Sequence, residues 1–252
     1  MPVGIDHQNG ITELTLNWPE TGNALGPTEA RQLRMAFAGI ASDACTRVAV
    51  LSARGAVFCS GGNLHAITEL VKGGADIVRT AIYGEFQELF RNVRDCPVPL
   101  FAAVDGPAIG LGADLALAAD TVFIGNAGWL KQGWISLGLI PATGGIMDFG
   151  RHTAANMFWP FVAASRVTAA EAQSMGLASA VPEGRAAALE LAETLAGLPG
   201  PQIRALKKLM KIRDPDTHLA AALDDQVRFL TDPAFIERAS ALLRRSVKKA
   251  PD

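Results

Sequence analysis

The sequence predicts an α/β protein with two regions, a β/α domain over residues 1–165 and a C-terminal helical region over residues 166–252. Two observations predict this class. In the first region, short and wholly apolar segments such as 48–51 alternate with longer amphipathic segments, which is typical of strands that are covered by helices on both faces. After about residue 165 the apolar strand pattern stops, and helical patterns follow one another.

The predicted strands differ in how many of their faces are apolar. Segment 11–16 alternates as a half-buried strand does, with Thr12, Leu14 and Leu16 on one face. Segments 48–51, 98–104 and 122–124 are apolar on both faces. A loop is expected over residues 17–23, where Asn, Pro and Gly are frequent.

Apolar residues at helical spacing predict helices from about residue 28, over 77–93 and over 114–119. In the C-terminal region, Thr168 and Glu171 form a capping box at the start of a helix, and Gly176 is a suitable stop. Further helical patterns lie at 185–197, 201–212, 217–230 and 233–247, and prolines separate them.

Composition excludes several classes of protein. The 23 Lys and Arg against 25 Asp and Glu give a net charge of −2, so the basic footprint of a nucleic-acid-binding protein is absent. An apolar fraction of 49% is that of a globular chain, and no uncharged apolar run is long enough for a membrane span. Cys45, Cys59 and Cys96 form neither a CxxC motif nor a metal framework. We therefore expect reduced thiols, a cytoplasmic location and no bound metal.

Two glycine-rich segments, 58–65 and 105–115, each follow a predicted buried strand. The second leads directly into a helix, whose first N–H groups are free and carry partial positive charge. Glycine lets a ligand approach such N–H groups, which suits the stabilisation of an oxyanion. A dinucleotide site is not indicated, because Leu115 stands where the third glycine of the G-x-G-x-x-G fingerprint belongs.

Five segments together resemble the crotonase superfamily, the enoyl-CoA hydratase/isomerase family. They are 23–25 (NAL), 58–65 (FCSGGNLH), 98–115 (VPLFAAVDGPAIGLGADL), 132–145 (QGWISLGLIPATGG) and 168–181 (TAAEAQSMGLASAV). The resemblance implies a spiral of ββα units, C-terminal helices that assemble a homotrimer or a dimer of trimers, and an acyl-CoA substrate. Coenzyme A would enter as part of the thioester, so no separate cofactor is expected.

The resemblance also implies roles for individual residues. Gly62 and Leu111 fall where two backbone N–H groups of the family hold the thioester oxygen. Ala24, Ser60 and Leu64 fall where the family contacts the adenine and the pantetheine arm. His65 would contact a phosphate or face solvent.

The acid–base positions depart from the family pattern. Hydratases of the family use two glutamates, and the first position is Asp114 here, which is one methylene shorter. The second is Trp134, whose indole donates a hydrogen bond but cannot act as a base. Trp134 would fill a core gap or form a wall of the acyl pocket. Asp148 would be a second acid or a solvated or helix-capping carboxylate.

A single carboxylate suits double-bond isomerisation better than hydration, because one group can move a proton between two carbons. We therefore expect an acyl-CoA-processing enzyme with Asp114 as its only acid and base. The alternatives are a non-catalytic acyl-CoA-binding protein, or a hydratase, decarboxylase or hydrolase of the same family.

Overall fold

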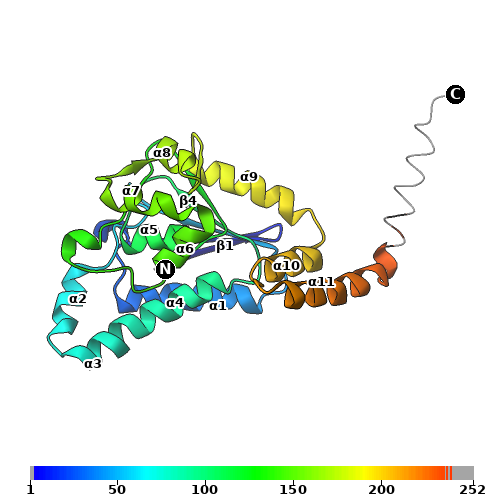
Figure 1. Ribbon diagram of the computed structural model, residues 1–252, viewed down its shortest axis with the longest axis horizontal. Coiled ribbons are helices and arrows are strands. Elements are labelled where there is room, and N and C mark those ends of the chain that lie inside the picture. The colour runs from blue at the N-terminus through cyan, green and yellow to red at the C-terminus, as the bar shows by residue number, and fades with distance from the viewer. Residues whose placement is uncertain (1–2, 236, 238, 240–252) are drawn as a thin grey trace. The chain divides into compact units, whose positions relative to one another are not determined.

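Six strands form a mixed sheet in the computed structural model, which describes residues 3–235, 237 and 239 (Figure 1). Only the first pair is antiparallel, and all other neighbours are parallel. In spatial order the strands are β1 (Val3–Gln8), β2 (Ile11–Leu16), β3 (Val48–Ala53), β4 (Leu100–Val104), β6 (Thr121–Ile124) and β9 (Ser179–Ala180). The predicted strand at 98–104 begins at Leu100, directly after Pro99, whose ring carries no N–H for a ladder.

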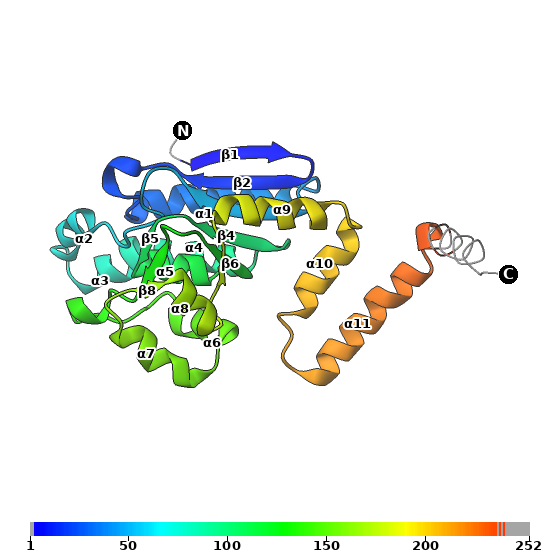
Figure 2. The same ribbon diagram turned by 90° about the horizontal axis from the view of Figure 1, so that it is seen from above.

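The central strands are buried on both faces, as their apolar runs predict. Leu51 and Ala102 belong to a large core that includes side chains of α1 (Pro27–Ser42) and α4 (Gly84–Arg94). Val50 and Phe101 point to the opposite face and pack with side chains of α9 (Gly184–Ala196). Figure 2 shows the same arrangement from above. Helices on both sides keep these parallel strands away from water.

The prediction that segment 11–16 is half-buried is wrong, because β2 is buried on both faces. Glu13, on the face expected to be polar and wet, is only 7% exposed. Its carboxylate accepts hydrogen bonds from Ser52 Oγ at 2.6 Å and from the guanidinium of Arg185 at 2.6 and 2.7 Å. These partners outweigh burial and hold the Glu13 pKa below its ordinary value, so a charged residue occupies a covered position.

A second, smaller sheet carries the glycine-rich region. It consists of β5 (Pro107–Ile109), β7 (Trp129–Lys131) and β8 (Val167–Thr168), and β5 leads into α5 (Leu111–Leu117). The helix predicted over 114–119 thus begins three residues earlier, immediately after Gly110. Short helical segments follow: η3 (Ile135–Leu137), α6 (Gly145–His152), η4 (Ala155–Met157), α7 (Phe158–Ala163) and α8 (Ala169–Ser174). The capping box of Thr168 and Glu171 is confirmed at the start of α8.

The helix predicted over 77–93 consists of three parts with different geometry. α3 (Ala75–Ile77) leads into the π-helical segment η2 (Val78–Tyr83), and α4 follows without a break. Earlier in the chain, η1 (Pro19–Thr21) lies within the predicted loop over residues 17–23, and α2 (Leu64–Val71) begins at the end of the first glycine-rich segment. A π-helical turn widens the helix and is frequent at functional sites.

The chain divides into two compact units, Met1–Leu198 and Pro199–Asp252. The predicted boundary lies earlier, after residue 165, but α9 lies beyond that point and packs on the first unit's sheet. In the second unit, α10 (Gly200–Leu209) and α11 (Pro215–Leu230) are joined by an ion pair between Lys208 and Asp225 at 2.7 Å. Most of the helical pattern at 233–247 lies outside the described residues. Over the described part of the chain, no helix combines the length and apolar character that a membrane span requires.

Candidate active site

The two glycine-rich segments run side by side and parallel. Cys59 pairs with Ala108, since Cys59 N–H donates to Pro107 O at 3.1 Å and Ile109 N–H donates to Cys59 O at 2.9 Å. A Cβ atom at Gly112 would lie 2.2 Å from Cys59 O. Only glycine therefore allows the start of α5 to approach the first segment this closely.

Gly62 and Leu111 each follow the paired residues Cys59 and Ala108 by three positions. Gly62 also forms a parallel bridge with Leu25, in which the neighbours Gly61 and Asn63 make the hydrogen bonds. In this pattern the N–H of Gly62 itself points away from Leu25. Leu111 is the first residue of α5, so its N–H has no acceptor within the helix. The N–H groups of Gly62 and Leu111 therefore have no partner within this bridge or within the helix.

Asn23 secures the loop that carries this bridge, a role that the resemblance of segment 23–25 does not imply. It is fully buried and adopts a φ of 55°, a left-handed conformation that asparagine tolerates better than most residues. Its side chain accepts from Trp18 N–H at 2.8 Å and donates to the carbonyls of Arg54 and Val57 at 2.9 and 2.8 Å. An asparagine in a loop between a strand and a helix is the only sequence signal for this role.

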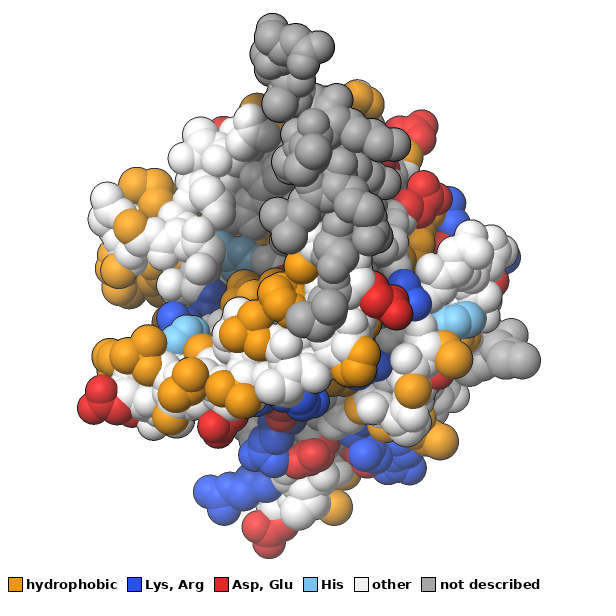
Figure 3. Space-filling model, turned by 90° about the vertical axis from the view of Figure 1, so that its right-hand side faces the viewer, with side chains coloured by type: hydrophobic (Ala, Val, Ile, Leu, Met, Phe, Trp, Pro, Cys, Tyr) orange, Lys and Arg blue, Asp and Glu red, His pale blue; other side chains and the backbone are white. Residues whose placement is uncertain are grey.

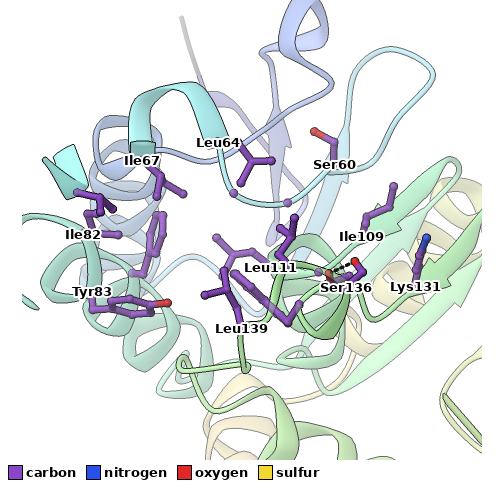
Figure 4. A pocket seen from close by; sticks show the side chains of 18 of the residues that line it. Ser60, Leu64, Ile67, Ile82, Tyr83, Ile109, Leu111, Lys131, Ser136 and Leu139 are labelled. Carbon is purple, nitrogen blue, oxygen red and sulfur yellow. Dashed lines mark hydrogen bonds between the residues drawn. The ribbon is translucent and has the colours of Figure 1, made fainter. Parts of the chain in front are cut away.

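Gly62 and Leu111 line a cavity of about 380 Å³ (Figure 4). Its walls are mostly apolar and come from α2, η2, α4, β5 and the segment after β7. Figure 4 shows Ile82 and Tyr83 toward one side and Ser60 and Lys131 toward the other, with Leu111 between them. Among the described residues, Lys131 is the only cationic side chain in this lining, and no ion pair engages it. The cavity is therefore suited to an apolar chain that ends in a polar or anionic portion.

The predicted binding residues are placed unequally. Ser60, Leu64 and Trp134 line the cavity. His65 is exposed on α2 and Ala24 is buried beside the loop, and neither lines the cavity. In the part of the chain that the structure describes, no group of three or more His, Cys, Asp or Glu side chains is placed to hold a metal ion.

Asp114 lies behind the cavity wall rather than in it. Its side chain is almost fully buried, at 2% exposure, and is absent from the lining. Oδ2 accepts a hydrogen bond from Trp134 Nε1 at 2.9 Å, and Oδ1 accepts one from Gln132 Nε2 at 3.4 Å. Burial raises the Asp114 pKa to about 7, although the Trp134 N–H favours the charged form. A carboxyl group with this pKa is available as both acid and base near neutral pH.

Asp148 is buried in α6, at 1% exposure, and does not line the cavity. Arg94 holds both of its oxygens, with Nε 3.0 Å from Oδ1 and Nη2 2.7 Å from Oδ2. Arg151 approaches to 3.7 Å. The structure thus places the candidate second acid in an ion pair, where its charge adds to the burial that raises the Asp114 pKa.

Comparison with known proteins agrees with this fold. The family model described as enoyl-CoA hydratase/isomerase matches residues 6–238. A probable enoyl-CoA hydratase from Mycobacterium tuberculosis is 30% identical over 97% of this chain and 98% of its own length. One from Rhodobacter capsulatus is 34% identical over 69% of this chain and 66% of its own length.

Solved structures show the same likeness. The crystal structure titled putative enoyl-CoA hydratase from Streptomyces coelicolor A3(2) superposes with a TM-score of 0.89. It is 26% identical, and the match covers 97% of this chain and 92% of that chain. The predicted α/β class and crotonase-like fold are confirmed, and the C-terminal helices are present. The chain belongs to the enoyl-CoA hydratase/isomerase family of the crotonase superfamily and is an enzyme of that family.

Proposed function

We propose that the enzyme binds an acyl-CoA thioester with its carbonyl oxygen between the N–H groups of Gly62 and Leu111, and that it moves a double bond within the acyl chain. The observation that carries this proposal is that both Gly62 and Leu111 line one mostly apolar cavity. Each such donor typically contributes about 3–4 kcal/mol to the stabilisation of an oxyanion. The acyl group then extends along the apolar wall of α2, η2 and α4.

Asp114 supplies the proton transfers in this proposal. As a carboxylate it removes a proton from C2 of a 3-enoyl thioester, and the electron pair moves into a dienolate whose oxygen the two N–H groups hold. The protonated Asp114 then returns the proton to C4, which leaves the 2-enoyl product and restores the carboxylate. A pKa of about 7 favours this use, because neither protonation state is costly near neutral pH.

Hydration is less well supported than isomerisation. It requires a positioned water and, in this family's pattern, two carboxylates. No Asp or Glu occurs among the described residues that line the cavity. Trp134 offers only an N–H donor, which already faces Asp114.

The position of Asp114 favours a second candidate function, acyl-CoA binding without turnover. Its carboxylate does not line the cavity, so a thioester could occupy the two backbone donors without meeting a base. Thioester hydrolysis also uses an oxyanion site, and release of free coenzyme A in the same assay detects it. Decarboxylation uses such a site too, and a carboxylated acyl-CoA added to the assay tests it.

The test compares native protein, Asp114→Asn and the control Asp76→Asn, whose carboxylate is exposed on α3. Each is assayed with 3-enoyl-CoA thioesters of several chain lengths and, for hydration, with 2-enoyl-CoA. Calorimetry with a saturated acyl-CoA measures binding. We expect isomerisation by the native protein and the control, and a loss of about 10²–10⁴ in kcat for Asp114→Asn.

Three results would contradict parts of the proposal. Equal isomerisation by Asp114→Asn would remove Asp114 from the mechanism. Faster hydration than isomerisation would reverse the preferred reaction. Tight binding of acyl-CoA without turnover of any substrate would favour the second candidate.

The assembly and location of the enzyme belong to the same proposal. Exposed apolar side chains on α10 and α11, among them Leu206, Leu219 and Leu223, support a homotrimer or a dimer of trimers. Figure 3 shows hydrophobic side chains interspersed with charged ones on the face that it draws. The three free cysteines support a cytoplasmic location. Light scattering on the purified protein tests the assembly.

A further inference from the structure

The Trp134 indole occupies two environments at once. One part of the side chain lines the cavity, and Nε1 donates to Asp114 Oδ2 at 2.9 Å on the other side. Asp114 itself is 2% exposed and does not reach the cavity. The indole therefore stands between the carboxylate and any acyl chain bound in the cavity.

The remaining surroundings of Asp114 leave its carboxylate little room to move. A Cβ atom at Gly145 would lie 2.3 Å from Asp114 Oδ1, so the backbone of α6 closes one side. Gln132 Nε2 lies 3.4 Å from the same oxygen, and Gln132 Oε1 accepts from Trp134 N–H at 3.1 Å. Access from the cavity to Asp114 is therefore controlled by the side chain of Trp134.

We infer that Trp134 is a positioning residue that holds Asp114 out of the cavity, and that a bound acyl-CoA turns the indole aside before Asp114 exchanges a proton with the acyl chain. This inference rests on the proposed use of Asp114 as the base. A ligand displaces a side chain only if it binds the displaced state better. Acyl groups that contact the cavity wall at Trp134 provide that difference, whereas free coenzyme A has no acyl group to make this contact.

The first test follows the indole N–H of Trp134 by NMR in protein labelled with ¹⁵N-tryptophan. The chain has four tryptophans, and Trp134→Phe identifies the signal that belongs to this residue. Trp129→Phe is the matched control on the preceding strand. Without ligand, we expect the Trp134 N–H to be protected from exchange with solvent, because it is buried and hydrogen-bonded.

A saturated acyl-CoA serves as the probe, since it has no double bond to move. We expect its binding to abolish the protection of the Trp134 N–H, while free coenzyme A leaves the protection unchanged. Protection that persists in the saturated acyl-CoA complex would overturn the inference. This readout requires binding but no turnover, so it still decides the inference if the proposed isomerisation fails.

The second test is the pH dependence of kcat/KM for Trp134→Phe. Phenylalanine retains most of the ring and keeps water out, but it removes the N–H that stabilises the Asp114 carboxylate. The charged groups that face Asp114 from neighbouring elements, Arg94 on α4 and Asp148 on α6, are unchanged in this variant. The Asp114 pKa should therefore rise, and the acid limb of the profile should move to higher pH.

An acid limb at the native position in Trp134→Phe would show that the indole does not act on the carboxylate, and it would overturn the inference. A purely structural role would lower kcat at every pH equally, without moving this limb. Trp129→Phe should reproduce the native profile. If the native protein isomerises no substrate, the proposed function is wrong and no pH profile can be measured. The NMR test then still decides the inference about Trp134, because it requires only binding.

Discussion

The candidate site has a backbone side and a carboxylate side, which are built in different ways. On the backbone side, parallel bridges at Gly62 and at Cys59 hold the two glycine-rich segments that carry Gly62 and Leu111. On the carboxylate side, Trp134 lines the cavity and Asp114 lies behind it, and side-chain hydrogen bonds hold both within a buried network. Backbone donors do not titrate, and only a change in the main chain displaces them. The carboxylate depends on its burial and on each neighbour, so it responds to pH and to single side-chain substitutions.

The largest expected effect comes from breaking the backbone side with Gly112→Ala. The added Cβ would lie 2.2 Å from Cys59 O, so the two glycine-rich segments must separate. We expect kcat/KM to fall about 10²–10³-fold, as when an oxyanion donor is lost, and stability to fall by about 1–3 kcal/mol. Gly150→Ala, in α6, is the control in kinetic and urea-unfolding assays, because its Cβ would meet no atom within 4 Å beyond its chain neighbours and its own helix backbone. Native kinetics in Gly112→Ala would show that this close approach is not needed.

The next largest effect tests whether the two sides act independently, because the substitution disturbs only the carboxylate. In Gly145→Ala the new Cβ would lie 2.3 Å from Asp114 Oδ1, which displaces the carboxylate without touching Gly62 or Leu111. We expect a loss of about 10²-fold in kcat, because a shift of about 1 Å in a catalytic group has that cost. Calorimetry should find the affinity for a saturated acyl-CoA unchanged. A large loss of affinity would mean that the two sides are not independent.

The third effect is on stability and concerns Asp114 alone. Its pKa rises from 3.8 to about 7 on folding, so between these values the folded state keeps a proton that the unfolded state has lost. Stability therefore falls as pH rises through this window, by at most about 1.4 kcal/mol per pH unit. Urea unfolding of native protein and Asp114→Asn at about pH 5 and about pH 8 should show this fall only in the native protein. Parallel pH dependence in both proteins would contradict the raised pKa.

The smallest expected effect tests the polar end of the cavity. Lys131 lines it without an ion pair among the described residues, and a CoA thioester carries several negative charges. We expect Lys131→Met to weaken acyl-CoA binding about two- to fivefold, as for a partly exposed ion pair. The difference should shrink at high salt. Lys72→Met, which removes an exposed lysine paired with Glu69, should bind like the native protein.

Apolar runs predicted β3, β4 and β6, because strands between two helical layers bury every side chain. β1 was not predicted, since only one of its residues is buried and its pairing with β2 provides the order. The burial of Glu13 was also missed, because Arg185, the partner that makes it possible, is 172 residues away. A local sequence pattern does not show which residue so far away in the chain will pair with a buried charge.

The candidate site also has features that the sequence predicts and features that depend on distant partners. The family resemblance supplied Gly62, Leu111 and Asp114, and their roles stay predictions. The resemblance also identified Trp134 as the departure from the family pattern, but not its contact. Residues 20 positions apart in different elements meet here. Only the packing of α5 against the segment after β7 determines whether the indole N–H reaches the carboxylate.

The sequence by itself determined the two glycine-rich segments, since close approach of main chains requires residues without side chains, as at Gly112. The sequence also determined that Asp114 and Trp134 stand at the two positions where the resemblance implies carboxylates. The tertiary structure alone decided that this carboxylate lies behind Trp134 and outside the cavity. Burial and hydrogen bonding depend on which elements meet, and these two quantities set the pKa and the accessibility of Asp114.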